Sequence, residues 1–436
     1  MPRTAEQRYS CHSCAGCCRD FTVQLRAEDV VRLNEQQWEQ RLGRSPIVHF
    51  RGRDWLRQRE DGACIFLQEN GLCRIHDEFG LENKPLACQM FPFALAPTEK
   101  GIQVGLSYAC PSMINNRGVE LSRHADDVRR MARLVPELRQ GQPRPVMLNA
   151  RLEAAVDEEQ AMIRAFERLL GRVDLSMGKR LDGAAWLTSM LRQAKLENVR
   201  GKRLDELLDL LVESFSEEID AAPLQLPTSR QMKVLRQIVF AHVEDVKIGE
   251  VQGHGIGGRA ITQFRRHHAF GRGRGAVPPV GPQWPALLRF EMVDGVQPAT
   301  DEAQIRPIDF LLLRYVRSRI MGGRTWGAGY YGWPIITGLE ALWMMLAATG
   351  WLARLHAGAD GRSALTMADV QAALLRTDRA AGRAPWLGSR GEKLRLAWLA
   401  EAAGVGRLLH TMRLTEESVE ADADDGAGES PDVASD

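Results

Sequence analysis

Cysteine is missing from residues 111–436, about three quarters of this 436-residue chain. All eight cysteines lie between residues 11 and 110, and chance would gather eight in the first quarter about once in 10⁵ sequences. The clustering therefore needs a chemical cause, which is either disulfide bonding or metal binding.

An apolar leader is also missing. The first eight residues, MPRTAEQR, contain no apolar stretch like that of a secretory signal. We therefore expect a cytoplasmic protein, and in a reducing cytosol dense cysteines indicate metal binding before disulfides. A chain of this length also needs no disulfides to compensate for a small core.

The sequence has no long uninterrupted hydrophobic run. Its most apolar stretch, residues 330–353, is interrupted by Pro334, Gly338 and Glu340. An unpaired carboxylate near the middle of a bilayer is costly, so this stretch predicts a buried helix of a soluble domain. We expect no membrane partner.

A strong net charge is lacking as well, since the chain carries +1 at neutral pH. Residues 416–436 nevertheless hold nine acidic and no basic residues, which predicts a disordered acidic tail. Basic residues surround His267 and His268, but few aromatics accompany them, so we favour a basic surface loop over a nucleic-acid partner. The basic residues of this group are Arg265, Arg266, Arg272 and Arg274.

The pattern of the chain changes near residue 118. Before it, short segments and turns predict strands at 47–50, 63–67 and 102–106 and a helix at 27–34. After it, helical periodicity appears at 151–170, 204–215, 232–246, 308–321, 334–356, 366–375 and 392–409. The predicted fold class is α+β, with a small irregular cysteine-rich metal-binding module (1–118) followed by a mainly α-helical domain (119–415). Glycines and prolines predict an irregular segment at 247–304 within that domain.

Four cysteines follow one another with the spacing of metal ligands. In a Cys-x2-Cys unit the turn lets two thiolates converge on one ion, so Cys11, Cys14 and Cys17 can meet at one centre. Adjacent side chains usually diverge, so Cys18 indicates either a second centre or a spare thiol beside one multi-iron cluster.

Four further cysteines complete the set of candidate metal ligands: Cys64, Cys73, Cys88 and Cys110. Eight thiolates could form two four-sulfur sites, which suit zinc or iron–sulfur clusters rather than magnesium or calcium. Buried free thiols are the alternative, and it carries most weight for Cys18 and Cys110.

Basic residues near these cysteines could offset the negative charge of the thiolates. Arg19, Arg74 and Lys84 are suitably placed in the sequence. His12 and His76 also lie close, but eight cysteines suffice for two centres, so we expect both imidazoles to face solvent or to support the ligands.

The cysteines belong to a longer motif. Its parts are Cys11, Cys14, Cys17 and Cys18-Arg19, then Cys64-x-Phe66-Leu67, Gly71-x-Cys73-x-Ile75 and Pro85-x2-Cys88-x2-Phe91-Pro92. This motif resembles the CxxCxxCC zinc- or iron-chelating family over residues 9–111. Members commonly have arginine where this chain has Lys84 and Gln89.

That family includes the small YkgJ-type cysteine cluster proteins and the larger flagellin lysine-N-methylases. The length of the chain and its long helical region resemble the methylase branch. The resemblance implies a protein-lysine N-methyltransferase that uses S-adenosylmethionine and acts on a protein substrate such as flagellin. It identifies no catalytic or cofactor-binding residue in this chain.

The residues themselves give no independent sign of S-adenosylmethionine. Residues 253–258 have the glycines of a nucleotide-binding turn but follow a segment too polar for a buried strand. The CxxxCxxC signature of common radical enzymes is absent. Trp326, Tyr330 and Tyr331 could line a pocket, although core packing is favoured for them.

Three functions are compatible with these features. The first is an iron–sulfur or iron enzyme that modifies a protein, and the second is a non-catalytic adaptor whose cysteine module is held together by zinc. The third is a redox or electron-transfer protein.

Overall fold

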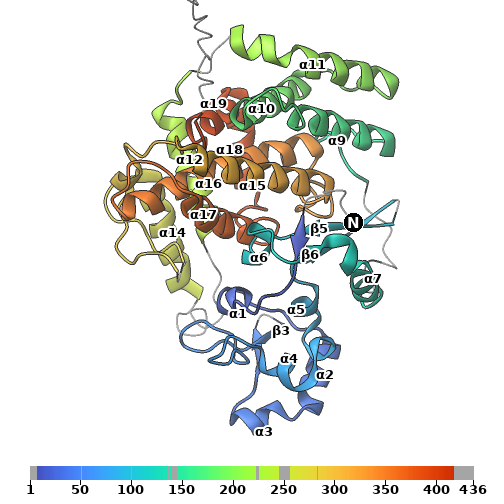
Figure 1. Cartoon of the computed structure of the whole chain (residues 1–436), viewed down its shortest axis with the longest axis vertical. Helices are drawn as coiled ribbons and strands as arrows, with labels where there is room; N and C mark the ends of the chain where they lie inside the picture. The colour runs from blue at the N-terminus through green and yellow to red at the C-terminus, as the bar shows by residue number, and fades with distance from the viewer. Residues whose placement is uncertain are drawn as a thin grey trace, which may run out of the picture.

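The computed structural model describes residues 7–50, 52–99, 101–135, 138, 145–221, 225–244, 256–281 and 283–416 (Figure 1). The fold is α+β and mainly helical, as predicted. Three two-stranded antiparallel sheets occur within these ranges. They pair β1 (Arg8–Tyr9) with β6 (Val119–Glu120), β2 (Ile47–Phe50) with β3 (Arg53–Leu56), and β4 (Phe93–Thr98) with β5 (Gly101–Leu106).

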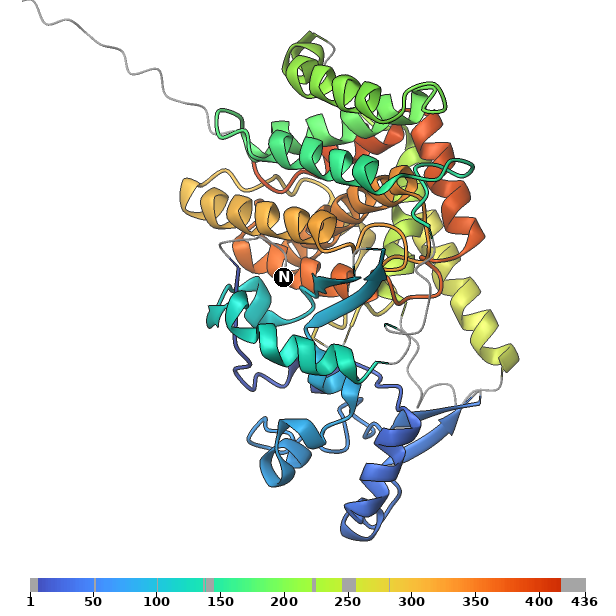
Figure 2. The same cartoon turned by 90° about the vertical axis from the view of Figure 1, so that its right-hand side faces the viewer.

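A small lobe, residues 19–90, carries most of the short elements. We call it the cysteine lobe. It has its own apolar core, in which Trp38 is fully buried against Phe66 at a ring-centroid distance of 4.9 Å. Its helices are α2 (Ala27–Glu35), α3 (Trp38–Leu42), α4 (Arg74–Phe79) and α5 (Leu86–Met90). Figures 1 and 2 both show this lobe at one end of the long axis of the molecule.

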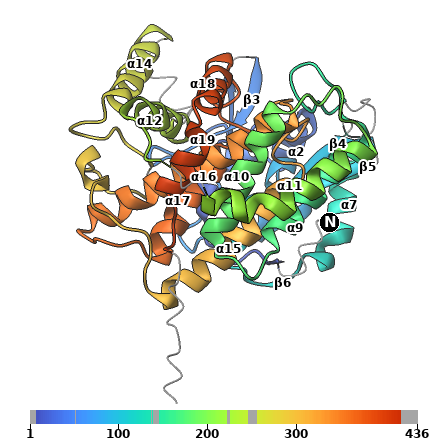
Figure 3. The same ribbon diagram turned by 90° about the horizontal axis from the view of Figure 1, so that it is seen from above.

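The longer helices form a second unit, which we call the helical body. They are α9 (Val156–Leu170), α10 (Met177–Gln193), α11 (Lys202–Ala221), α12 (Ser229–Val243), α14 (Ile256–Arg272), α15 (Glu302–Met321), α16 (Ile335–Ala359), α17 (Met367–Ala380), α18 (Arg390–Glu401) and α19 (Gly404–Thr411). In Figure 3, α16 runs through the middle of the body, between α12 and α17 on one side and α10 on the other.

Helix α16 is apolar on nearly every side, which is typical of a fully buried helix. Among the described residues it is the one helix long and apolar enough to cross a membrane, and 94% of its most apolar window is buried inside the protein. The prediction of a buried core helix at this position is therefore confirmed.

The segment around Cys110 belongs to the core of the helical body. Sheet β4–β5 and helix α6 (Pro111–Ile114) contribute Phe93, Leu106 and Met113 to the same apolar cluster as α15 and α16. Helix α7 (Ala125–Arg133) adds Val128 and Met131 to that cluster. The cysteines are thus attached to two different cores, because Cys64 and Cys73 pack against the core of the cysteine lobe.

Two buried ionic groups of the helical body fix the chain on both sides of Cys110. Asp378 of α17 accepts hydrogen bonds from Ser107 Oγ at 3.0 Å and from the Ala109 backbone N–H at 3.1 Å. Arg314 of α15 donates to the carbonyl oxygens of Met113 and Ile114 at 3.2 and 2.9 Å. These bonds satisfy buried polar groups and tie the segment to the body.

Several predicted elements agree with the structure. Strands β2 and β5 lie at 47–50 and 101–106, and helix α2 begins at Ala27 as expected. The strand expected at 63–67 is wrong. The Cys64 N–H donates to the Cys18 carbonyl at 2.7 Å and the Leu67 N–H returns to Cys64, so the backbone turns instead of pairing with a strand.

Two corrections concern the helical body. Helix α14 occupies 256–272, within the segment expected to be irregular, because Phe270 is fully buried against Phe290 and this packing outweighs the low helix propensity of glycine. The helix expected at 392–409 is interrupted at Ala403, which has a left-handed φ of 50°. The predicted acidic tail lies outside the described residues beyond Glu416, as do residues 245–255, which include Gly253 and Gly255.

Candidate metal centre

Seven of the eight cysteines line one cavity of about 430 Å³. They come from four places along the chain. Cys11 and Cys14 precede α1 (Gly16–Asp20), Cys17 and Cys18 lie on α1, Cys73 immediately precedes α4, Cys88 lies on α5, and Cys110 immediately precedes α6. The structure therefore brings together sulfurs that are up to about a hundred residues apart in sequence.

Cys64 does not line this cavity but lies directly behind it. Its backbone N–H binds the Cys18 carbonyl, and its thiol packs against the core of the cysteine lobe. Burial raises the pKa of the Cys64 thiol, and the neighbouring Cys88 and Cys73 raise it further. Cys64 is thus joined to the seven cavity cysteines through the backbone of Cys18.

The sulfurs of Cys17 and Cys18 lie 3.9 Å apart. The expectation that their side chains diverge is wrong here, because both residues lie on helix α1, where neighbouring side chains are only about 100° apart. In a zinc site with four thiolates, Zn–S bonds of about 2.3 Å place neighbouring sulfurs about 3.8 Å apart. The Cys17–Cys18 separation is close to this value.

The whole set of sulfurs is more widely spread than this one pair. No three of the cysteine sulfurs in the described chain come within 4.8 Å of one another. A single closed zinc shell would need four sulfurs at about 3.8 Å. The arrangement therefore leaves room inside the ring of cysteines.

Burial keeps the thiols of Cys88 and Cys110 protonated at neutral pH. It raises the pKa of both Cys88 and Cys110 to about 12. Backbone N–H groups of Met113 and Ser112 act in the opposite direction at Cys110, because they donate to its sulfur. Thiolates bind metals and thiols do not, so a metal that binds here has to displace protons.

Lys84 supplies positive charge to the cavity. Burial lowers the pKa of its ammonium, but Cys88, Cys73, Cys18 and Cys17 outweigh burial, so the net shift is upward. Of the other two cations expected nearby, Arg74 instead pairs with Glu78 at 2.8 Å and lies over the Trp38 ring, and Arg19 is exposed. Neither lines the cavity.

Sequence reasoning missed a second cation, Arg130 of α7. It lines the cavity and donates from Nη1 to Gln89 Oε1 at 3.3 Å, while Gln89 Nε2 donates to the Lys84 carbonyl at 2.6 Å. Gln89 therefore links both cations. Arg130 could not be found from the sequence, since nothing in its spacing relates it to the cysteines.

An aromatic wall closes one side of the cavity. Tyr9 packs edge-on against Phe93 at 5.7 Å and against the His124 ring at 5.3 Å. Burial raises the pKa of Tyr9, and Cys11, Cys110, Cys17 and Cys14 add to the increase. His12 and His76 lie at the exposed edge, where His12 Nδ1 is 2.7 Å from the Ser10 carbonyl oxygen.

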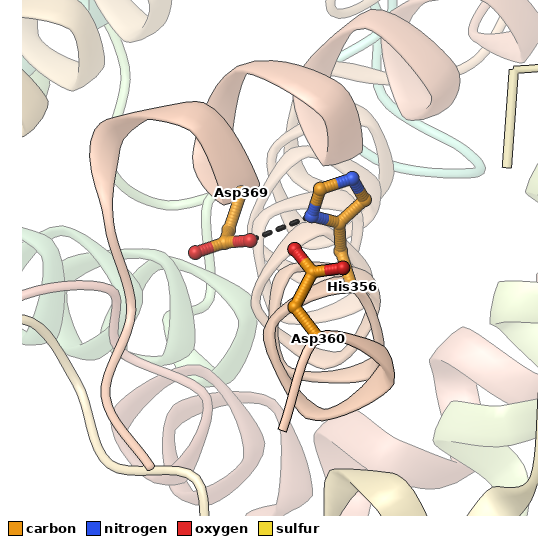
Figure 4. A group of neighbouring side chains, drawn as sticks. All are labelled: His356, Asp360 and Asp369. Atoms are coloured by element: carbon orange, nitrogen blue, oxygen red, sulfur yellow. Dashed lines mark hydrogen bonds and ion pairs between the residues drawn. The ribbon is translucent and has the colours of Figure 1, made fainter. Parts of the chain in front are cut away.

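A second group of possible metal ligands occurs far from the cysteines. His356, Asp360 and Asp369 lie together in Figure 4, with His356 Nδ1 2.6 Å from Asp369 Oδ1. Arg362 pairs with both carboxylates, and Asp369 accepts the Thr366 backbone N–H at 2.8 Å. Burial raises the pKa of Asp369, but these hydrogen bonds outweigh it and lower the pKa. Asp369 and Thr366 together form the capping box at the start of α17.

The remaining candidates from the sequence lie elsewhere. Trp326 and Tyr330 are buried in the main core, in agreement with core packing, and Trp326 donates to Glu159 at 2.7 Å. The prediction of a surface loop for the basic group at 265–274 is wrong, since most of the group lies on helix α14. Arg266 pairs there with Glu244 at 3.2 Å, and His267 contacts Arg395 at 3.1 Å. None of these residues lines the cysteine cavity.

Comparison with known proteins supports the metal-binding interpretation. Residues 10–111 match the CxxCxxCC family model, described as a "Putative zinc- or iron-chelating domain". An uncharacterized protein of Methanocaldococcus jannaschii is 36% identical over 88 residues, which make up 20% of this chain and 29% of that protein. The chain thus covers less than a third of this curated relative. No solved structure matches it.

The class that these observations define is a cysteine-cluster protein similar to zinc- or iron-chelating domains. The resemblance to the CxxCxxCC family is confirmed over the cysteine region. The YkgJ-type and lysine-methylase branches stay predictions.

Proposed function

We propose that the eight cysteines hold an iron–sulfur centre and that the adjoining cavity admits a substrate. The observation that carries this proposal is the cavity of about 430 Å³ lined by seven cysteines. Structural zinc sites are closed shells of four ligands, whereas cofactor and ligand sites commonly enclose about 300–1,000 Å³. The spread of the sulfurs favours a centre larger than a single ion.

The residues of the chain fit such a centre. Cysteine thiolates are the usual ligands of iron–sulfur clusters, which when bound supply electron transfer. Lys84 and Arg130 would offset the negative charge of the thiolates. Tyr9, Phe93 and His124 would keep water from one side of the centre, while the exposed Cys11 and Cys14 leave the other side open.

We further propose that the substrate is a protein and that the reaction is methyl transfer to lysine from S-adenosylmethionine. Support comes from the resemblance to the flagellin lysine-N-methylases and from the exposed edge of the cavity at Cys11, Cys14 and His76, which a long side chain could reach. The helical body would then contribute to holding the protein substrate.

The metal is tested first. Protein purified without oxygen should be brown, absorb near about 400 nm and contain iron with acid-labile sulfide. Colourless protein with stoichiometric zinc and no iron would overturn the iron–sulfur proposal.

The reaction is tested separately. Metal-loaded protein is incubated with S-adenosylmethionine carrying a labelled methyl group and with flagellin, and label in lysine is measured by mass spectrometry. Cys17→Ala should abolish transfer, whereas Lys202→Gln, at an exposed position on α11, should leave it unchanged. Absence of label with fully loaded protein would exclude methyl transfer to flagellin.

A zinc-held adaptor is the second candidate. It is favoured by the Cys17–Cys18 sulfur distance of 3.9 Å, which matches one edge of a zinc tetrahedron. On this alternative the zinc-loaded protein has no methyl-transfer activity and its optical spectrum is featureless above the aromatic bands. Reversible oxidation and reduction of a coloured centre without turnover would instead favour electron transfer.

A further inference from the structure

The helical body contains a buried carboxylate, one oxygen of which has no hydrogen-bond partner among the described residues. Glu340 of α16 is 2% exposed, and its Oε1 accepts from Arg192 Nη1 at 2.7 Å. Its Oε2 is buried and makes no hydrogen bond with any described part of the chain. Leaving a buried acceptor unsatisfied costs about 1–3 kcal/mol, so this atom calls for a donor.

Glu340 lies on the wall of a separate cavity of about 220 Å³. The cavity is formed by α10, α16, the end of α11 and the junction of α18 with α19. Figure 1 shows α10, α11 and α19 at the end of the molecule opposite the cysteine lobe. The cavity is therefore distinct from the candidate metal centre.

Three carboxylates line this cavity at different depths. Glu340 is buried, Asp182 has a side chain that is 11% exposed, and Glu218 lies on the surface. Arg192 engages one oxygen of Glu340, and His410 Nδ1 lies 2.7 Å from Asp182. The carboxylates do not gather as metal ligands do, because no three such atoms here fall within 4.8 Å of one another. They suit a ligand with positive charge at separate points.

The rest of the lining is largely apolar. Ala185, Trp186, Ala400 and Val405 border the space between the carboxylates. Such a surface suits methylene groups, and the Trp186 ring can also attract a cation. Burial raises the pKa of Glu340 to about 7, and a bound cation would favour its ionised form.

We propose that this cavity binds an aliphatic diamine. One ammonium donates to Glu340 Oε2, the methylene chain lies along the apolar wall, and the other ammonium lies near Asp182 and Glu218 at the mouth. The unpartnered oxygen can accept a hydrogen bond, the separated acids suit two positive charges, and the apolar lining suits a hydrocarbon spacer.

Calorimetric titration of the full-length, metal-loaded protein with putrescine tests the proposal. We expect saturable one-to-one binding of putrescine, at least tenfold weaker binding of n-butylamine, which lacks the second charge, and no binding of butanediol. Equal binding of the mono- and diamine would overturn the two-point arrangement, and absence of putrescine binding would overturn the site.

Variants locate the binding. Glu340→Gln should weaken putrescine binding at least tenfold, whereas Glu401→Gln removes the same charge from an exposed position of α18 outside the lining and should have no effect. Equal loss in both would mean a general charge effect and would refute the site.

A further variant covers the case in which Glu340→Gln fails to fold. Ser189→Phe on α10 fills the cavity without changing a carboxylate, and it should abolish binding while circular dichroism stays unchanged. Retained binding in Ser189→Phe, or crystals grown with putrescine that show only water on Glu340 Oε2, would rule out the proposal.

Discussion

At the scale of single residues, Lys84 distinguishes this cysteine site from a bare group of thiols. The residue is half-buried, four cysteines raise the pKa of its ammonium, and Gln89 Nε2 donates to its backbone carbonyl at 2.6 Å. A buried cation near thiolates lowers the cost of ionising them. Metal affinity should therefore depend on this one charge.

We expect Lys84→Gln to weaken metal binding about tenfold, which corresponds to about 1.4 kcal/mol. The substitution removes the positive charge while it keeps a chain of similar length. Competition with a chromophoric chelator measures the affinity. Lys202→Gln is the matched control, since that lysine is 90% exposed and distant from the cysteines, and equal effects in both variants would contradict a local role for Lys84.

His242 is a second residue whose surroundings determine its charge. It is buried beneath α17, with Nδ1 3.2 Å from the Thr377 carbonyl oxygen, and burial lowers its pKa from 6.5 to about 4. The unfolded chain therefore binds a proton between pH 6.5 and 4 that the folded protein does not. Stability contributed by neutral His242 is complete above pH 6.5 and is lost as the pH falls toward 4.

We expect the wild type to lose about 2 kcal/mol more stability than His242→Asn between pH 7.5 and 5, because only the wild type carries this proton linkage. Urea unfolding followed by tryptophan fluorescence at both pH values gives the difference. His268→Asn, at an exposed position of α14, should follow the wild type. Parallel pH dependence of wild type and His242→Asn would show that His242 does not titrate as its burial indicates.

At the scale of elements, α16 depends on glycine where other segments cross it. A Cβ on Gly350 would overlap the carbonyl group of Met412, and one on Gly338 would overlap that of Thr325. These glycines let the backbones of neighbouring segments approach the helix directly. Close packing against this buried helix therefore depends on the absence of a side chain at these two positions.

We expect Gly350→Ala to destabilise the protein by about 1–3 kcal/mol, because the added methyl has no space. Gly178→Ala in α10 should instead be neutral or stabilise by up to about 1 kcal/mol, since its Cβ would meet nothing closer than 3.8 Å and alanine favours helix. Chemical denaturation measures both. A gain in stability for Gly350→Ala would contradict the close approach.

The elements also show what sequence patterns can predict. Periodicity located α9, α12, α15, α16 and α17, because each buries one stripe or all of its surface. Periodicity did not predict α14, because glycines interrupt the pattern and the helix is stabilised by the tertiary packing of Phe270. It also failed at 63–67, where an apolar run is folded into a turn by bonds to the distant Cys18 segment.

The candidate site was predictable only in part. Residue type and spacing identified the cysteines, which lie together in the structure, and Lys84. They could not identify Tyr9, His124 or Arg130, because these residues reach the cavity through the packing of β1 and α7. The paired orientation of Cys17 and Cys18 depends on a short helix that begins after the left-handed Ala15.

At the scale of the whole molecule, the cysteines connect two units that have separate cores. Cys64 and Cys73 belong to the cysteine lobe, whereas Cys110 is buried in the core of the helical body. A metal centre bound by all of them would cross-link the units. Binding that occurs only in the joined arrangement stabilises that arrangement.

We expect removal of the metal to release the cysteine lobe while the helical body stays folded. Hydrogen exchange measured by mass spectrometry should then show faster exchange in residues 19–90 and unchanged protection in α15 and α16. Reloading the metal should restore protection. Uniform loss of protection across α16 would instead mean that the metal supports the entire fold.

The hydrogen bonds of Ser107 and Ala109 to Asp378, which hold the segment before Cys110, also bear on how the protein matures. Ala109 precedes its hydrogen-bond partner Asp378 by 269 residues in the sequence. At a synthesis rate of about 5–20 residues per second, the ribosome adds Asp378 roughly 15–50 s after Ala109. During that time the first seven cysteines have been synthesised, but the hydrogen bonds that hold the segment before the eighth have not formed. Complete metal loading would therefore follow synthesis of α17, and the nascent chain would need protection from oxygen or from the wrong metal until then.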